Sequence, residues 1–261
     1  MRKRIFFVFM IIVMLSSMTA CSDKTSETGA KSTFTVGFDE NFPPMGFIGE
    51  DGKHTGFDLE LAAEVAKRLD MELVLQPIAW DAKEMELESK NIDCVWNGFT
   101  INGREDDYTW TAPYMKNYQV FVVRADAGIK TKADLAGKVV AVQADSSAEK
   151  ALEKESGLVE SFGDYIRTPD YEIALMDLKA GAIDAVAMDE VVARYKIEQR
   201  DEEFVILEET LAAEEYGVGF LLGNTELRDK VQAALEEMAK DGTMAKISEK
   251  WFGKDVTIIG K

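Results

Sequence analysis

Arg104, Asp189 and the segment Asp145-Ser146-Ser147 have the chemistry best suited to holding a small charged molecule. A guanidinium presents a planar fork of donors that matches a carboxylate, and each charge-assisted bond contributes roughly 1.5 to 3 kcal/mol. The serines lie between a predicted strand and a predicted helix, where free backbone N–H groups favour an anion. Asp189 supplies the opposite charge, which suits an ammonium group. Together these residue types indicate a receptor for a zwitterionic α-amino acid.

Each of these residues also has a simpler structural explanation. Arg104 precedes the acidic residues 105–107 and could form a surface ion pair that contributes little energy. Asp145 and the serines could only cap a helix. Trp80 and Phe42 have flat rings that could enclose an apolar stem or lie against a cation, but they could equally pack in the core. Their shared placement at the ends of predicted strands favours the binding interpretation.

The predicted elements explain how these residues could meet, because one order of strands and helices occurs twice. In the first copy we predict strands at 34–38, 73–76 and 93–96, a helix capped by Asp58 and a helix at 82–89. In the second copy we predict strands at 139–143, near Phe162 and at 185–188, with helices at 147–153 and 171–180. This alternation is typical of an α/β fold with parallel sheets covered by helices on both faces.

Ligands of open α/β sheets bind beyond the carboxyl ends of the strands. This rule nominates four segments, at 39–42, 97–104, 145–147 and 189–190. Two of the segments fall in each half of the chain. If the halves face each other, one ligand between them could contact all four segments.

The composition excludes several classes of function. The chain of 261 residues has a formal net charge of −18 at pH 7, whereas binding to nucleic acid depends on clustered Lys and Arg. Its single His and two Cys are too few for a zinc or iron–sulfur site. We therefore expect no nucleic-acid partner, no metal and no cofactor.

Residues 1–20 have the pattern of a secretory signal peptide. They contain three consecutive bases and no acid, continue as an apolar run over residues 5–15, and end in small residues before Cys21. The run is shorter than the roughly 20 residues that a membrane-spanning helix needs. Without this leader the net charge is −21, so no basic patch remains to bind anionic lipid.

The segment Met18-Thr19-Ala20-Cys21 resembles the lipobox of bacterial lipoproteins, with Met in place of the usual Leu. The resemblance implies that Cys21 carries acyl chains such as palmitate, and that residues 21–32 form a flexible tether. The alternative is ordinary cleavage near Ala20 with an incidental Cys. We predict an extracytoplasmic body that is anchored to the bacterial cell membrane by lipid alone.

Short motifs follow one another along most of the chain: Gly56-Phe57-Asp58-Leu59-Glu60, Gly98-Phe99-Thr100-Ile101, Gly181-Ala182-Ile183-Asp184-Ala185-Val186, Asp241-Gly242-Thr243 and Lys250-Trp251-Phe252-Gly253. With them, from Phe34 to Gly253, the sequence resembles the bacterial extracellular solute-binding proteins of family 3, the receptors of polar amino acid ABC transporters. The resemblance implies a two-lobed periplasmic-binding-protein fold of type II. Each lobe is then a mostly parallel sheet flanked by helices, with hinge crossings near 116–118 and 212–216. Lobe 1 comprises 33–117 and 214–261, and lobe 2 comprises 118–213.

The resemblance also implies a role for individual residues. By this resemblance Arg104 and Ser147 bind the α-carboxylate, with Ser146 next to Ser147, and Asp189 binds the α-amino group. Gly98 and Thr100 contact both groups, with Asn97 next to Gly98. Trp80 and Phe42 stack on the ligand, and Asp39 contacts its side chain. Asp145 stands where the family usually has Gly. Its charge disfavours a carboxylate nearby unless the side chain turns back to cap the helix.

The function that these features predict is capture of a free amino acid, by a monomer, and delivery to the permease of an ABC transporter. Asp39 and Glu40 favour a polar or cationic side chain. One alternative is an enzyme on the same scaffold, similar to a cyclohexadienyl dehydratase, with Asp189 or Glu190 as the acid–base group. Another is a ligand-sensing module. We expect a binding protein and no catalytic residue.

Overall fold

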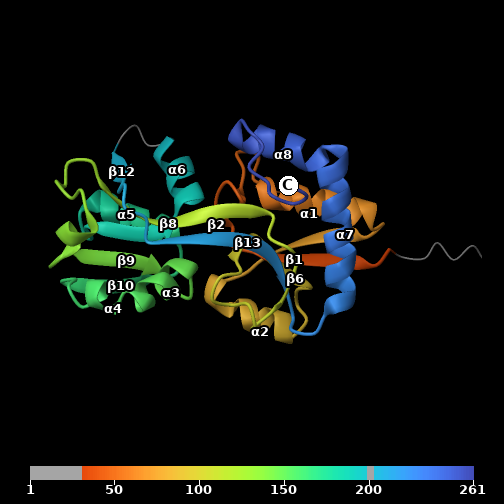
Figure 1. Cartoon of the computed structure of the whole chain (residues 1–261), viewed down its shortest axis with the longest axis horizontal. Helices are drawn as coiled ribbons and strands as arrows, with labels where there is room; N and C mark the ends of the chain where they lie inside the picture. Colours follow the sequence, from red (N-terminus) through yellow and green to blue (C-terminus); the bar gives the residue numbers. More distant parts are fainter. Residues whose placement is uncertain (1–30, 199–202) are drawn as a thin grey trace, which may run out of the picture. The chain divides into compact units, whose positions relative to one another are not determined.

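The computed structural model describes residues 31–198 and 203–261 (Figure 1). The predicted signal peptide 1–20, the lipidation site Cys21 and residues 21–30 of the predicted tether lie outside the described residues. Within the described part, no helix is both long and apolar enough to span a membrane.

The longer strands and the helices follow one another in the predicted order in both copies, from β1 to β6 and from β9 to β11, and further short strands lie between them. The strands are β1 (Thr33–Phe38), β2 (Asn41–Phe42), β3 (Gly46–Ile48), β4 (His54–Thr55), β5 (Glu72–Pro77), β6 (Cys94–Thr100), β7 (Thr109–Trp110), β8 (Met115–Arg124), β9 (Val139–Gln143), β10 (Asp164–Thr168), β11 (Ala185–Asp189), β12 (Phe204–Ile206) and β13 (Ala212–Phe220). The helices are α1 (Phe57–Arg68), α2 (Lys83–Glu88), α3 (Ser147–Lys154), α4 (Ser156–Val159), α5 (Tyr171–Ala180), α6 (Glu190–Glu198), α7 (Thr225–Asp241) and α8 (Thr243–Phe252), with 3-10 turns η1 (Trp80–Ala82) and η2 (Lys132–Leu135).

The main sheet consists of two parallel parts joined by two long antiparallel strands. Its order is β10-β9-β11-β8-β13-β6-β1-β5. In one part β1 pairs in parallel with β5 and β6, and in the other β9 pairs in parallel with β10 and β11. Helices lie on both faces of each part (Figure 1). This is the predicted two-lobed α/β architecture.

The strands β8 and β13 run from one lobe into the other (Figure 1). β8 pairs with β13 from Met115 to Gln119, and with β11 from Gln119 to Val123. β13 likewise turns from β8 to β6 at Tyr216. Because side chains alternate along a strand, Asn117 and Gln119 on β8 face the same side. Glu214, directly opposite Asn117, faces that side from β13.

Two predicted details of the fold differ in the structure. Asp58 is not the cap of α1, because Gly56 precedes the helix and the Asp58 carboxylate accepts a hydrogen bond from the Gly98 amide at 2.6 Å. The strand expected near Phe162 is β10, which begins at Asp164, because the short helix α4 and a turn occupy the residues before it. Phe162 packs against the core of that lobe instead.

Candidate functional site

The predicted site residues lie at the carboxyl ends of strands from both lobes. Asn97, Gly98 and Thr100 form the end of β6, and Asp189 ends β11. Asp39 follows β1, and the two serines open α3 after β9. Ser147 is half-buried, whereas the side chains of the other non-glycine residues are buried: Asp39, Phe42, Trp80, Asn97, Thr100, Arg104, Ser146 and Asp189. Thr100 donates to the Ser147 hydroxyl at 3.1 Å, so residues of the two lobes meet there.

Arg104 is a buried cation and not part of a surface ion pair. Its side chain is only 2% exposed and lies over the Phe99 ring at 5.4 Å. Nη1 donates to the Thr100 carbonyl at 3.4 Å, and Nη2 donates to the Asp145 carbonyl at 3.0 Å. Nε has no hydrogen-bond partner among the described residues. A buried donor without a partner costs about 1 to 3 kcal/mol, so a ligand carboxylate at this atom would be well bound.

Asn97 on β6 and Gln119 in the middle of β8 present further buried polar atoms. Neither amide atom of Asn97 has a partner in the described part of the chain, and the Gln119 Oε1 atom has none either. The other end of Gln119 is held, because its Nε2 donates to Ser147 at 2.9 Å and to Glu214 at 2.8 Å. The site therefore combines fixed side chains with polar atoms that are free to bind a ligand.

Asp189 is an acceptor held in place by three donors. Oδ1 accepts from Asn117 at 2.9 Å and from the Tyr216 hydroxyl at 2.5 Å, and Oδ2 accepts from the Tyr171 hydroxyl at 3.1 Å. Burial raises the pKa of Asp189, while the hydrogen bonds from Tyr216 and its neighbours oppose the rise. A cation beside it would favour the ionised form, which suits the predicted contact with an ammonium group.

Glu214 is a second buried carboxyl group that joins Asp189. Its Oε1 accepts from Asn117 at 2.6 Å and from Gln119 at 2.8 Å. Burial, followed by the charge of Asp189, raises the pKa of Glu214 to about 8. At neutral pH this carboxyl group is therefore mostly protonated, and it shares a hydrogen bond with Asp189.

Asp39 lies at a cavity whose lining is acidic. The cavity measures about 350 Å³, and its lining includes the carboxylates of Asp39, Glu40, Asp81 and Asp170 together with Trp80. No Lys or Arg occurs among the described residues that line it. Asp39 accepts from the Gln143 amide at 2.8 Å, which links the lobes, and burial raises its pKa. The surroundings favour a positively charged group.

The aromatic residues combine a packing role with a place at the site. Trp80 belongs to a small buried cluster and meets Phe99 edge-on at 5.4 Å, so the core explanation applies to its ring. Phe42 lies 5.9 Å from Tyr171 of the other lobe. Gly98 adopts φ +58°, and a Cβ atom there would lie 2.9 Å from the Phe42 ring. Only glycine leaves this part of the site undistorted.

Asp145 does not cap the helix that follows it. Ser146 is the cap, because its hydroxyl accepts from the Glu149 amide at 3.1 Å. Asp145 adopts the left-handed conformation at φ +55°, which glycine favours and Asp tolerates. Its carboxylate pairs with Lys83 of the other lobe. The negative charge near the proposed carboxylate position is thus neutralised by a cation.

The family model of the bacterial extracellular solute-binding proteins, family 3, matches residues 34–254. The chain belongs to this family. Its membership confirms the resemblance seen in the sequence and gives the protein an extracytoplasmic location and a solute-binding role. The enzyme hypothesis gains no support, since the similar proteins described next are binding proteins.

Similar proteins of the family bind different amino acids. The L-cystine-binding protein TcyJ of Escherichia coli K12 is 37% identical over 239 residues, which cover 90% of this chain and 87% of TcyJ. The structure of a Streptococcus pneumoniae ABC uptake transporter substrate-binding protein with bound histidine has a TM-score of 0.83 at 35% identity, covering 86% of this chain and 94% of that one. An ancestral arginine-binding protein bound to arginine has a TM-score of 0.79 at 38% identity, covering 86% and 100%.

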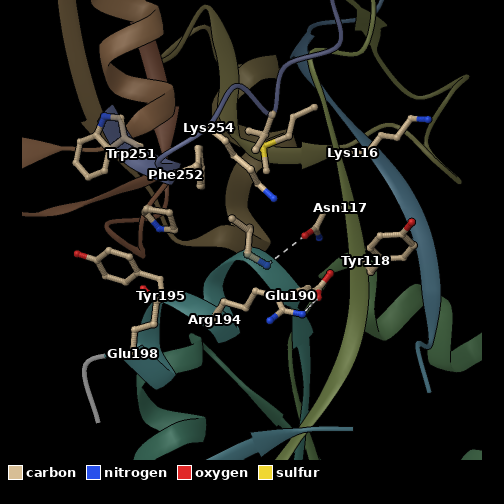
Figure 2. Close-up of a pocket in the computed structure, with 14 residues that line it drawn as sticks. Lys116, Asn117, Tyr118, Glu190, Arg194, Tyr195, Glu198, Trp251, Phe252 and Lys254 are labelled. Carbon is tan, nitrogen blue, oxygen red and sulfur yellow. Dashed lines mark hydrogen bonds and ion pairs between the residues drawn. The ribbon is translucent and has the colours of Figure 1, made fainter. Parts of the chain in front are cut away.

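A second cavity lies apart from the predicted site residues. It measures about 420 Å³ and is lined by residues of α6, of β8 and of the segment from Trp251 to Val256, and by none of the predicted site residues (Figure 2). Asn117 connects it to the site, because its Oδ1 accepts from the Val191 amide at 3.2 Å while its Nδ2 donates to Asp189 and Glu214. Asn117 therefore ties the start of α6 to the buried carboxyl pair.

Sequence reasoning missed four residues that form hydrogen bonds with the predicted site residues or with one another: Lys83, Asn117, Gln119 and Glu214. Three of them are on the crossing strands, within or beside the predicted crossings at 116–118 and 212–216. Their alternate spacing was the available signal, because polar residues at every second position of a central strand share one face. Lys83 carried no comparable signal, since a Lys near the start of a short helix is usually exposed.

Proposed function

We propose that this family member binds a free amino acid between its two lobes and delivers it to the permease of an ABC transporter. The supporting observation is the placement of opposite charges. Arg104 offers a free Nε donor near the beginning of α3, and Asp189 offers a fixed carboxylate at the end of β11. Both side chains are at most 3% exposed. A zwitterion satisfies the two groups together, since its carboxylate and ammonium carry the complementary charges.

The acidic cavity at Asp39 supports a ligand whose side chain ends in a nitrogen group. Four carboxylates line this cavity, and Asp39 is itself buried. The similar proteins bind cystine, histidine or arginine. Each of these ligands can carry a positive charge at its distal end, whereas the amide of glutamine is neutral. We therefore propose arginine, lysine, histidine and cystine ahead of glutamine and of acidic or purely apolar amino acids.

Isothermal titration with these amino acids tests the proposal. The wild-type protein is expected to bind at least one of them, and Asp189→Asn is expected to lower the affinity at least about 100-fold, since it removes the partner of a buried ammonium. Glu190→Gln is the matched control: it makes the same charge change at the next residue, which pairs with Arg194 and lines the other cavity. Binding of no amino acid by the wild type would refute the proposal.

Asp39→Asn tests the preference for a distal nitrogen group. The variant keeps an acceptor for the Asn41 amide at 2.8 Å but loses the charge. The Asn amide group also replaces the oxygen that accepts from Gln143 across the lobes, so every ligand is expected to lose some affinity. Arginine and lysine are expected to lose about 10-fold more than glutamine. An equal loss for charged and neutral ligands would show that Asp39 acts through folding alone.

We also propose the finer features that the sequence predicts. These are lobes of residues 33–117 with 214–261 and of 118–213, acylation of Cys21 after removal of 1–20, and a monomeric protein. Mass spectrometry of the membrane-bound protein would show the acyl chains, and Cys21→Ala is expected to release the protein from the membrane. Light scattering of the mature domain is expected to give the mass of one chain.

A further inference from the structure

The loop at Asp145 accepts several hydrogen bonds from side chains of the other lobe. The Asp145 carbonyl accepts from Trp80 Nε1 at 3.2 Å, from Lys83 Nζ at 3.3 Å and from Arg104 Nη2 at 3.0 Å. The Asp145 carboxylate also pairs with Lys83. These donors belong to the lobe of β6, and Asp145 follows β9 of the other lobe. We call the contacts between Lys83 and Asp145 the inter-lobe latch.

Lys83 is the unusual member of the inter-lobe latch. Its side chain is 0% exposed, although a Lys is almost never fully buried unless it is paired. Within the same lobe it reaches the Trp80 carbonyl at 3.1 Å, and its other partners are the carbonyl and carboxylate of Asp145. Arg104, a second cation, lies near enough to disfavour the charge on Lys83. Among the residues that the structure describes, the one carboxylate that pairs with the Lys83 ammonium is therefore on the opposite lobe.

We propose that Lys83 and Asp145 form a built-in latch that sets how firmly the lobes close, and that this latch is separate from the contacts made to the amino acid. The proposal extends the proposed function, because closure traps the ligand between the lobes. Separation of the lobes parts the two residues and returns both charges to water. Closure then requires the Asp145 charge, because without it Lys83 would be buried with no counter-ion.

The two members of the pair are expected to respond unequally to substitution. Asp145→Asn tolerates the left-handed backbone but leaves a buried ammonium without its counter-ion, so affinity is expected to fall about 10- to 100-fold. Lys83→Met replaces the ammonium with an unbranched apolar chain. The Asp145 side chain is 38% exposed and can remain hydrated, so the loss is expected to stay below about 5-fold.

The double variant gives the decisive signature. If the defect of Asp145→Asn comes from the unpaired Lys83 charge, adding Lys83→Met removes that charge and restores affinity to within about 5-fold of the wild type. Glu153→Gln is the matched control, since it removes an exposed acid from α3 and is expected to change nothing. Thermal unfolding of all variants checks that each is folded.

Titration and small-angle X-ray scattering of the purified chain together test the latch. We expect Asp145→Asn to bind more weakly and Lys83→Met to rescue it. A defect that Lys83→Met fails to rescue, or equal affinities for wild type and Asp145→Asn, would overturn the proposal. If the wild type binds no amino acid, the proposed function fails. Scattering without ligand then decides the latch: a larger radius of gyration for Asp145→Asn supports it, and an unchanged radius overturns it.

Discussion

Replacing Glu214 by Gln is expected to stabilise the protein at high pH. Burial and the neighbouring Asp189 raise the pKa of Glu214 from 4.5 to about 8. A carboxyl group whose pKa is higher in the folded state stabilises the fold fully below pH 4.5, and loses that contribution as the pH rises through 8. Each tenfold change in the proton equilibrium corresponds to about 1.4 kcal/mol. The ionised Glu214 therefore costs on the order of 5 kcal/mol well above pH 8.

A Gln side chain at position 214 can make the same contacts as the protonated Glu214, but it does not ionise at high pH. Its carbonyl can accept from Asn117 and Gln119, as Glu214 Oε1 does at 2.6 and 2.8 Å. Its amide can donate toward Asp189, as the protonated carboxyl does. The difference in unfolding free energy between variant and wild type is thus expected to be below about 1 kcal/mol at pH 5, and to grow to the order of 5 kcal/mol at pH 9.

Urea unfolding at pH 5, 7 and 9, followed by tryptophan fluorescence, measures this difference directly. Glu215→Gln is the control, because it removes a carboxylate from the next residue of β13, on the opposite face of the strand. Its effect is expected to be independent of pH. The reasoning fails if Glu214→Gln and the wild type show the same pH dependence, because Glu214 would then already be ionised at little cost.

Other substitutions probe the remaining parts of the site. Gly98→Ala is expected to lose about 1 to 3 kcal/mol of stability in urea unfolding and to weaken ligand binding, because φ is +58° and a Cβ lies 2.9 Å from the Phe42 ring. Asp58→Ala removes a buried acceptor from the Gly98 amide and the Tyr114 hydroxyl, and should cost about 2 to 4 kcal/mol by the same assay. Arg104→Lys keeps the charge but loses the planar fork, so titration should show an affinity about 10- to 100-fold lower.

The strand ends were predictable because they depend on local pattern and on one general rule of α/β sheets. The hydrophobic runs locate β1, β6, β9 and β11, and the rule that ligands bind beyond the carboxyl ends then selects Asp39, Asn97, Ser146 and Asp189. No knowledge of the loops was needed for this step. The structure brings these segments together, and their assignment to a ligand stays a prediction.

The long-range partners of two side chains could not be predicted from the sequence. Asp58 has the position of a helix cap, but its carboxylate turns to the Gly98 amide, which is 40 residues away in the chain. Asp145 also precedes a helix, yet its carboxylate pairs with Lys83 of the other lobe. Both residues have the sequence position of a helix cap, but each binds a partner that is far away in the sequence and close only in the folded chain.

Closure of the two lobes, as we propose it, pairs charges that come from opposite sides. Arg104 and Lys83 in one lobe, with Asp189 and Asp145 in the other, place cations against anions in an otherwise acidic protein. Lys83 and Asp145 satisfy each other, so they favour closure whatever the ligand is. Arg104 and Asp189 are buried away from water, so each lacks a nearby opposite charge. The carboxylate and the ammonium of a zwitterion would supply these two charges. If both proposals hold, the specificity for an amino acid follows from Arg104 and Asp189, and the tightness of closure follows from Lys83 and Asp145.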